Sequence, residues 1–256
     1  MEIRNELKQV LKHLRLSGLL YALPDRVAYA RGQKLSYEAF VELILNDEWE
    51  RRQQSAVTRR LAKALVHPEQ TLERFDWEAP ITLDQEKVKD LFSFSFIERR
   101  ENILLCGPVG VGKTHLANAL GHSACRRGIE VLMIRAALLF KRLLQSRADN
   151  SFGKELLRFV RPALLIVDDF GLQKLTPEQA HDLYEIVIER YGIASTILTS
   201  CRHVEEWMNL FDDPLLANSI LDRLTHNAHQ IFIEGESYRK RNTLKPQPPG
   251  KKRKES

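Results

Sequence analysis

The sequence predicts an α/β fold, in which a parallel sheet carries helices on both faces and is preceded by a small all-helical region. Three observations lead to this prediction. Strand-like and helix-like segments alternate after residue 67, a glycine-rich loop follows one of the strands, and residues 1–66 are helical in pattern. We therefore expect a helical N-terminal domain at 1–66, an α/β domain at 67–238 and a basic tail at 239–256.

The first 66 residues show apolar residues at helical spacing. Leu7, Val10, Leu11 and Leu14 recur at the spacing of a first helix. A second helix is expected to start at Ser36, which would act as its N-cap, and to bury Phe40, Leu43 and Ile44. A third helix is expected over residues 47–65. His67-Pro68 then interrupts the pattern and marks the predicted domain boundary.

The third expected helix has an apolar side and a basic side. At about 100° per residue, Val57, Leu61, Ala64 and Leu65 gather on one side. A helix of this kind can pack inward and contact DNA phosphates outward, and an ordinary solvated face is the alternative interpretation. The candidate DNA contacts on the basic side are Arg52, Arg59, Arg60 and Lys63.

The next 170 or so residues alternate regularly between the two kinds of element. Apolar runs predict strands at 101–107, 130–134, 162–171 and 195–200, with a further strand at 231–235. Helices are predicted at 115–128, 137–147 and 177–192, the last begun by Pro177 and ended by Gly192. This order is typical of a parallel sheet covered on both faces.

Composition restricts the class of protein. The chain is 43 % apolar and 29 % charged, which is ordinary for a globular protein, and no apolar run approaches the ~20 residues that span a bilayer. Cys106, Cys125 and Cys201 form no CxxC pair, and the eight histidines show no metal-ligand spacing. We therefore expect a cytoplasmic protein with no membrane partner, no zinc site and no disulfide framework.

The positive charge is concentrated at the C-terminus. Residues 239–256 contain eight Lys or Arg and one Glu, a net charge of +7, against +5 for the whole chain. The remainder is close to neutral. Such a tail can bind nucleic acid phosphates, and a disordered solubilising end is an equally good interpretation.

The glycine-rich loop carries the clearest motif. The run GPVGVGKT matches the pattern Gly-x4-Gly-Lys-Thr, with a strand before it and a helix after it. Backbone N–H groups of such a loop bind the phosphates of ATP at the positive end of a helix dipole, the lysine reaches the β- and γ-phosphates, and the threonine ligates Mg²⁺. The predicted nucleotide-binding residues are Gly107, Pro108, Val109, Gly110, Val111, Gly112, Lys113, Thr114 and, directly after them, His115.

A second motif lies about fifty residues further along. The apolar run 164–167 leads into Asp168 and Asp169. At the carboxyl end of a buried strand, Asp168 is expected to hold the hydration shell of Mg²⁺, and Asp169 to orient and deprotonate the attacking water. Phe75 and Trp77 are candidates to border the adenine, although core packing is the commoner role of such residues.

These motifs resemble those of AAA+ ATPases, and within them the helicase-loader clade. Segments along nearly the whole chain are similar to the IstB-type helper ATPases of insertion-sequence transposition. They include LKHLRLSGLL, TLERFDW, VDDFG, TSCRHVEEW, DDPLLANSILDRL and GESYRKR. The resemblance implies a P-loop AAA+ core after the helical N-terminal domain.

Further site residues follow from the resemblance alone. Ser200 matches a polar sensor, followed by Cys201 where related proteins often have Asn, and Asp169 stands where AAA+ proteins commonly have Glu. Arg223 matches the arginine finger that acts on ATP held by a neighbouring subunit, and Arg239 matches the second sensor arginine. In this clade the helix between the two ATP motifs faces bound DNA, which makes Arg135, Lys141, Arg142 and Arg147 further DNA candidates. An ordinary solvated helix face is an equally good interpretation of these residues.

The resemblance implies an ATP- and Mg²⁺-dependent ATPase that forms a homo-oligomer with shared ATP sites. It would bind double-stranded DNA, prepare a target site and stimulate the transposase of the same element. Two alternatives remain. A replicative helicase loader would use the N-terminal region to bind a helicase, and an ATP-gated DNA scaffold would hydrolyse little ATP.

Overall fold

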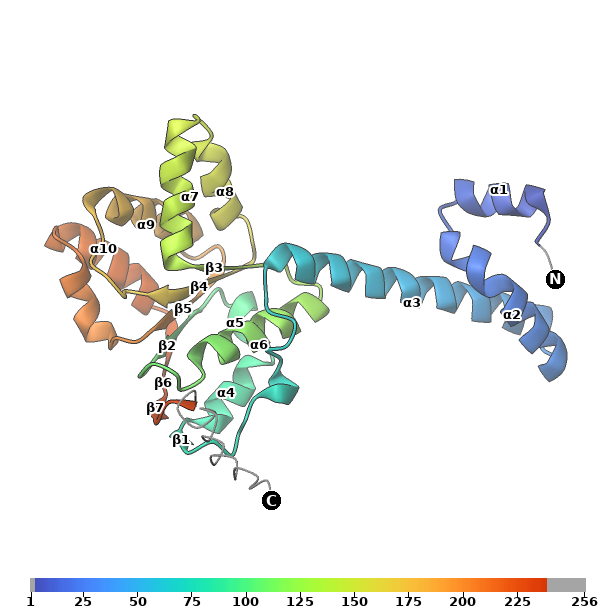
Figure 1. Cartoon of the computed structure of the whole chain (residues 1–256), viewed down its shortest axis with the longest axis horizontal. Coiled ribbons are helices and arrows are strands. Elements are labelled where there is room, and N and C mark those ends of the chain that lie inside the picture. The colour runs from blue at the N-terminus through green and yellow to red at the C-terminus, as the bar shows by residue number, and fades with distance from the viewer. Residues whose placement is uncertain (1–2, 239–256) are drawn as a thin grey trace, which may run out of the picture. The chain divides into compact units, whose positions relative to one another are not determined.

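The computed structural model describes residues 3–238, which fall into two compact units (Figure 1). The first unit comprises Met1–Arg60 and the second Leu61–Ser256. Among the described residues, no helix is both long and apolar enough to cross a membrane. Arg239 and the predicted basic tail, 239–256, lie outside the described residues.

The first unit consists of helices α1 (Asn5–His13), α2 (Ser17–Gln33) and most of α3 (Tyr37–Ala64). The hydroxyl of Ser36 accepts a hydrogen bond from the amide of Ala39 at 3.2 Å, which confirms Ser36 as the cap of a helix. The prediction of separate helices after Ser36 and over 47–65 is wrong, because α3 is continuous. Asn46 and Asp47 do not break a helix, and Asp47 instead accepts two hydrogen bonds from Arg26, at 2.6 and 2.8 Å.

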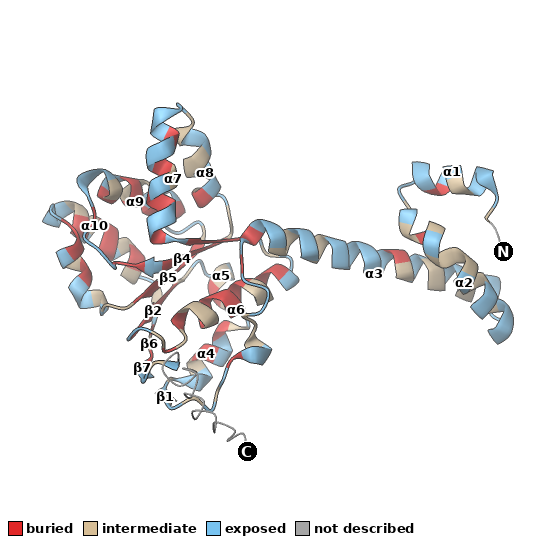
Figure 2. Ribbon diagram, in the orientation of Figure 1, coloured by how far each residue is buried: buried red, intermediate tan, exposed pale blue. Residues whose placement is uncertain are grey.

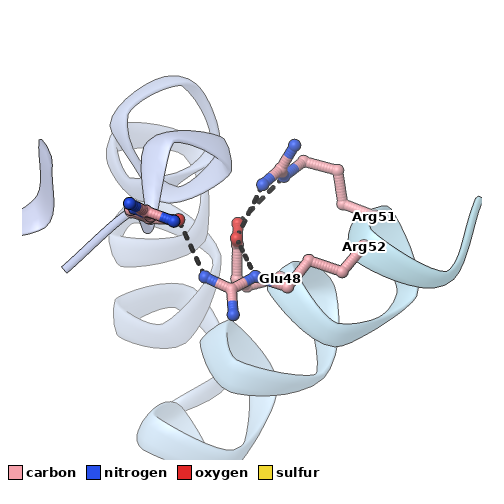
Figure 3. Close-up of polar contacts among 4 residues, drawn as sticks. Glu48, Arg51 and Arg52 are labelled. Atoms are coloured by element: carbon pink, nitrogen blue, oxygen red, sulfur yellow. Dashed lines mark hydrogen bonds and ion pairs between the residues drawn. The ribbon is translucent and has the colours of Figure 1, made fainter. Parts of the chain in front are cut away.

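An ionic cluster holds these helices where apolar burial is sparse. Among the described residues of the first unit, only Leu11, Leu19 and Glu48 are buried. Glu48 accepts hydrogen bonds from Arg51 at 2.7 and 2.9 Å and from Arg52 at 2.8 Å (Figure 3). Arg52 also donates to the carbonyl oxygen of Arg15 at 2.7 Å, so the cluster connects α3 to the turn between α1 and α2. These hydrogen bonds, with that from Arg51 the largest cause, lower the pKa of Glu48 to about 2.

The second unit is built on a parallel sheet in the order β3-β4-β5-β2-β6. The four strands predicted between residues 101 and 200 are all present. The strand predicted at 231–235 is divided, because its first part belongs to the main sheet and its last two residues pair with β1 in a separate antiparallel ribbon. The strands are β1 (Ile81–Thr82), β2 (Asn102–Cys106), β3 (Val131–Arg135), β4 (Leu164–Phe170), β5 (Ser195–Ser200), β6 (Ala228–Phe232) and β7 (Glu234–Gly235).

Helices cover both faces of the sheet (Figure 1). Alternate strand residues enter two separate cores: Leu104 packs on the side of α7 and α9, and Leu105 packs on the side of α6. Figure 2 shows the buried residues along the strands and on the inner sides of these helices. The helices of this unit are η1 (Leu72–Arg74), α4 (Gln85–Leu91), α5 (Ser95–Glu98), α6 (Lys113–Arg126), α7 (Ala136–Ala148), α8 (Phe152–Val160), α9 (Pro177–Arg190), η2 (Val204–Leu210) and α10 (Pro214–Thr225).

Candidate nucleotide-binding site

A cavity of about 700 Å³ lies over the glycine-rich loop. It is bounded by the loop and the start of α6 on one side and by the segment before β1 on the other. That volume is in the range of pockets that hold small ligands. The lining includes seven of the predicted nucleotide-binding residues, from Val109 to His115, together with Asp169, Cys201 and Tyr238.

Backbone geometry explains why the loop needs glycine. Gly107 has φ +145°, and a Cβ there would lie 2.1 Å from the carbonyl oxygen of Ile233. Gly112, the residue before α6, has φ +100°, which L side chains rarely adopt. The chain therefore turns sharply from β2 into α6, and the free amides of the first turn of α6 face the cavity as an anion-binding group.

Lys113 is buried beneath this loop. Only 8 % of the residue is exposed, and its ammonium donates to the carbonyl oxygens of Gly107 and Pro108 at 2.7 and 2.6 Å. Burial lowers the pKa of Lys113, and the nearby Cys201 and Asp169 oppose that shift. A buried ammonium that faces a cavity is stabilised by an anionic ligand, so the environment of Lys113 suits a phosphate group.

Asp168 lies at the centre of a hydrogen-bonded group that joins three elements. Its Oδ1 accepts from the hydroxyl of Thr114 on α6 at 2.9 Å and from the hydroxyl of Thr199 on β5 at 2.6 Å. The residue is only 4 % exposed, and these bonds hold its carboxylate beside the threonine of the P-loop motif. A carboxylate and a hydroxyl at this distance form the partial oxygen set that Mg²⁺ uses when phosphate and water supply the remaining ligands.

Asp169 is held away from the regular strand. The pairing of β4 with β5 shifts register between Val167 and Phe170, and Asp169 has φ +57° at that bulge. Its amide donates to the hydroxyl of Thr199 at 3.0 Å. The bulge leaves Asp169 exposed on the cavity wall, while its neighbours on both sides remain buried. Thr199 therefore supports both aspartates, a role that the sequence analysis did not predict.

Ser200 and Cys201, the two candidates for the polar sensor, lie in different environments. Ser200 is fully buried, donates to the carbonyl oxygen of Phe170 at 2.8 Å and accepts from the amide of Arg202 at 3.1 Å. Cys201, the next residue, lines the cavity and Ser200 does not. In this arrangement the hydroxyl of Ser200 stabilises the turn after β4, and Cys201 is the one of the two residues that lines the cavity.

Aromatic residues form the far end of the cavity. Phe75 lines the cavity and is also part of the core beneath α6. Its position therefore fits both the prediction that it borders the adenine and the alternative that it packs in the core. Its ring packs edge-on against His115, with 5.4 Å between ring centroids. His115 in turn hydrogen-bonds the carbonyl oxygen of Thr71 at 2.9 Å. His115 thus fastens the segment before β1 to the P-loop helix.

Arg223 lies at the opposite end of the sheet. It is on α10, its Nη1 donates to the carbonyl oxygen and hydroxyl of Ser219, both at 2.7 Å, and it does not line the cavity over the P-loop. The sheet separates it from its own Lys113, since the P-loop follows the carboxyl end of β2 and Arg223 lies beside the amino ends of the strands.

The candidate DNA contacts differ in their partners. Arg52 is tied to Glu48 and Arg15, and Arg142 forms an ion pair with Glu155 at 3.7 Å that joins α7 to α8. Both arginines already have structural partners. The exposed cations among the remaining candidates include Arg59 and Lys63 on α3, Arg135 at the end of β3 and Lys141 on α7, while Arg60 is half-buried.

The fold and the site define a P-loop ATP-binding protein with an AAA+ core. Residues 9–246 match the family model of IstB-like ATP-binding proteins, and the chain belongs to that family. It is 39 % identical over 236 residues to an insertion-sequence ATP-binding protein of Mycobacterium tuberculosis, covering 92 % of this chain and 94 % of that one. It is 36 % identical over 235 residues to the ATP-binding protein of insertion sequence IS21 from Pseudomonas aeruginosa, covering 92 % and 89 %.

Solved structures share the fold. The replication initiator DnaA bound to AMPPCP and single-stranded DNA matches with a TM-score of 0.57 and 23 % identity, over 67 % of this chain and 52 % of that one. DnaI matches with a TM-score of 0.56 and 21 % identity, over 64 % and 90 %. These comparisons confirm the predicted α/β fold with a P-loop AAA+ core and the predicted family.

Proposed function

We propose that this protein is an ATPase that assists insertion-sequence transposition. It binds ATP with Mg²⁺ between subunits of a homo-oligomer, assembles on double-stranded DNA and stimulates the transposase of the same element. The family and its insertion-sequence relatives support the transposition context. In this proposal residues 1–66 bind DNA or a partner, 67–238 form the ATPase domain and 239–256 form a basic tail.

The observation that carries the shared ATP site is the position of Arg223. The lysine, threonine and aspartates of the two ATP motifs gather at the carboxyl edge of the sheet, and Arg223 lies at the amino edge. An arginine so placed acts on a nucleotide only if a second copy brings its own P-loop to this edge. One subunit then supplies Lys113, Thr114, Asp168 and Asp169, and the next supplies Arg223, which stabilises negative charge on the phosphate in the transition state.

Each residue of the site has a role in hydrolysis. Lys113 exchanges its two carbonyl partners for phosphate oxygens, and Thr114 with Asp168 would hold Mg²⁺, which neutralises phosphate charge. Asp169 accepts a proton from the attacking water, since its carboxylate is exposed on the cavity wall. Arg239 would act as the second sensor, and Ser200 or Cys201 as the first.

Sedimentation of the protein with a plain DNA duplex tests the assembly. With ATP we expect one large protein–DNA complex, and with ADP or no nucleotide a small species. DNA binding that is absent in every nucleotide state would assign the N-terminal helices to protein recognition, and a replicative helicase loader would then be the better interpretation. A pull-down with a replicative helicase would test that function.

One observation favours a second candidate, an ATP-gated DNA scaffold with little hydrolysis. Cys201 lines the cavity, and a thiol is a weak hydrogen-bond partner for an attacking water. Steady-state phosphate release in the presence of DNA distinguishes the two. Turnover that DNA stimulates supports the ATPase, and ATP-dependent DNA binding without turnover supports the scaffold. Replacement of Cys201 by Asn, with Cys125→Ala as a cysteine control away from the site, should raise turnover if the thiol limits it.

A further inference from the structure

A second cavity, of about 180 Å³, lies at the amino ends of the strands. It is formed where α9 and α10 end and where β2, β5 and β6 begin. Among the described residues that line it, none is acidic, and two are asparagines, Asn102 and Asn227. The lining includes four arginines: Arg99, Arg100, Arg190 and Arg223. So many cations around one small space attract an anion.

Arg190 places a buried positive charge beneath this cavity. It is 2 % exposed, and its guanidinium donates to the hydroxyl of Thr196 and to carbonyl oxygens of Phe159, Val160, Pro162 and Ser195. Within the described part of the chain, no carboxylate pairs with it. Burial lowers its pKa to about 10, so Arg190 remains charged at neutral pH. A buried cation without a counter-charge is costly, and an anion in the adjoining cavity would reduce that cost.

Arg223 and Arg100 each have one guanidinium nitrogen fixed by the protein. Arg223 Nη1 is held by Ser219, and its guanidinium carbon lies 5.9 Å from the centre of the Tyr191 ring. Arg100 Nη1 donates to the carbonyl oxygen of Gly192 at 2.7 Å. In residues 3–238 the Nη2 and Nε groups of both arginines have no acceptor. Two positioned guanidinium groups with spare N–H donors are suited to a phosphate group, which can accept from both.

The size of the cavity limits its ligand. At about 180 Å³ it admits a phosphate group but not a whole nucleotide, since pockets that enclose drug-sized ligands measure about 300–1,000 Å³. The oxyanion must therefore be free phosphate or the end of a larger molecule that enters from outside. Arg223 is proposed to act on ATP bound by a second copy of the chain, so the end of a larger molecule is the better match.

We propose that Arg100 joins Arg223 in an oxyanion site that receives the terminal phosphate of ATP bound by a second copy of this chain. This inference rests on the proposed function and adds a second residue to its trans-acting face. Arg190 supplies fixed charge behind the phosphate, and Arg99, which is 64 % exposed and 3.8 Å from Glu101, lies outside the pair. Arg100 and Arg223 would contact the phosphate directly.

Mixing two variants, each impaired in a different half of the shared site, tests the inference. Lys113→Ala removes ATP binding and keeps Arg100 and Arg223, whereas Arg100→Ala keeps the P-loop and lacks the proposed trans donor. We expect Arg100→Ala alone to reduce ATPase activity by about tenfold or more. A mixture with Lys113→Ala should show activity several-fold above the sum of the two proteins alone, because the mixed interface contains one intact half from each.

Controls separate this inference from the function on which it rests. Arg223→Ala mixed with Lys113→Ala tests the shared site itself, and Arg161→Ala removes an exposed arginine that lines neither cavity. Suppose that the mixture of Arg223→Ala with Lys113→Ala recovers activity but Arg100→Ala alone is fully active. That result would refute the role of Arg100 and leave the shared site intact. Restoration in neither mixture would refute the shared site as well. Arg100→Lys keeps the charge without the planar fork, and should recover only part of the activity.

Free phosphate is the other source of the same chemistry. Thermal denaturation of the wild-type protein with and without inorganic phosphate, in the absence of nucleotide, distinguishes it. Stabilisation by phosphate that Arg100→Ala abolishes, combined with no rescue in the mixing experiment, would assign the cavity to free phosphate and overturn the trans proposal. Rescue on mixing supports the trans proposal whether or not phosphate alone binds.

Discussion

At the scale of the residue, Thr199 is the side chain on which both aspartates depend. Its hydroxyl donates to Asp168 and accepts from the amide of Asp169, so one oxygen fixes the carboxylate and the bulge that follows it. The sequence signal for this role was weak. A threonine in a buried strand is common, and only its place beside the predicted sensor, Ser200, distinguished it.

Replacement of Thr199 by Val should therefore reduce ATPase activity strongly while the protein still folds. The volume is nearly unchanged, but the buried carboxylate loses a charged hydrogen bond worth about 1.5–3 kcal/mol, which corresponds to a reduction of about tenfold to a hundredfold if the loss falls on the transition state. Steady-state ATPase assays across a Mg²⁺ titration measure it. Thr58→Val removes a hydroxyl that donates to the carbonyl oxygen of Gln54 on α3, and is the control. Unchanged turnover and Mg²⁺ dependence in Thr199→Val would show that Asp168 needs no such support.

At the scale of the element, two ionic side chains connect segments that are distant in sequence. Arg52, held in place by Glu48, connects α3 to the turn after α1, and Arg190 connects the end of α9 to the end of α8 and to β5. Each occupies a place where apolar contacts alone would not fix the geometry. Hydrophobic periodicity predicted most of these helices, but it carries no information about such polar connections.

Glu48→Gln should destabilise the first unit in a pH-dependent way. The pKa of Glu48 is about 2 in the folded protein, against 4.5 for an unperturbed glutamate side chain, so its contribution is full above pH 4.5 and is lost as pH falls toward 2. Because its arginine partners are 42 % and 51 % exposed, we expect a loss of about 1–2 kcal/mol at neutral pH. Thermal denaturation followed by circular dichroism at pH 7 and pH 3 measures it, with the exposed Glu50→Gln as control. An equal effect at both pH values would contradict the role of the charge.

Arg190→Leu should destabilise the second unit by about 3 kcal/mol or more, because several buried carbonyl oxygens lose their donor at once. Chemical denaturation measures the free energy of unfolding. The comparison with Arg190→Lys is informative, since lysine keeps the charge but cannot reach carbonyls of two separate segments. If Arg190→Leu were as stable as the wild-type protein, the polar connection between α8, α9 and β5 would contribute nothing.

At the scale of the whole molecule, the strands and P-loop of the ATP-binding unit and the helical character of the N-terminal unit were predictable, whereas the bounds of the N-terminal helices were not. The strands from Asn102 to Ser200 and the P-loop followed from apolar runs that end in glycine or aspartate, because a buried parallel strand leaves a strong local signal. The division of the last predicted strand depended on a pairing with β1, far away in sequence. Asp47 within α3 pairs with Arg26 on α2, a contact between segments distant in sequence that no local pattern reveals.

Two exposed cations on α3 provide a test of how the whole protein would bind DNA. Arg59 and Lys63 are four residues apart, so they lie on one side of the helix. If each neutralises one phosphate, the double variant Arg59→Ala/Lys63→Ala should bind duplex DNA more weakly, and the slope of log K against log salt should decrease in magnitude by about 2. The measurement is a fluorescence-anisotropy titration of duplex DNA with ATP at several salt concentrations. Lys141→Ala provides a comparison on α7 of the ATP-binding unit. An unchanged slope would exclude these two contacts, and this face of α3 would then be an ordinary solvated surface.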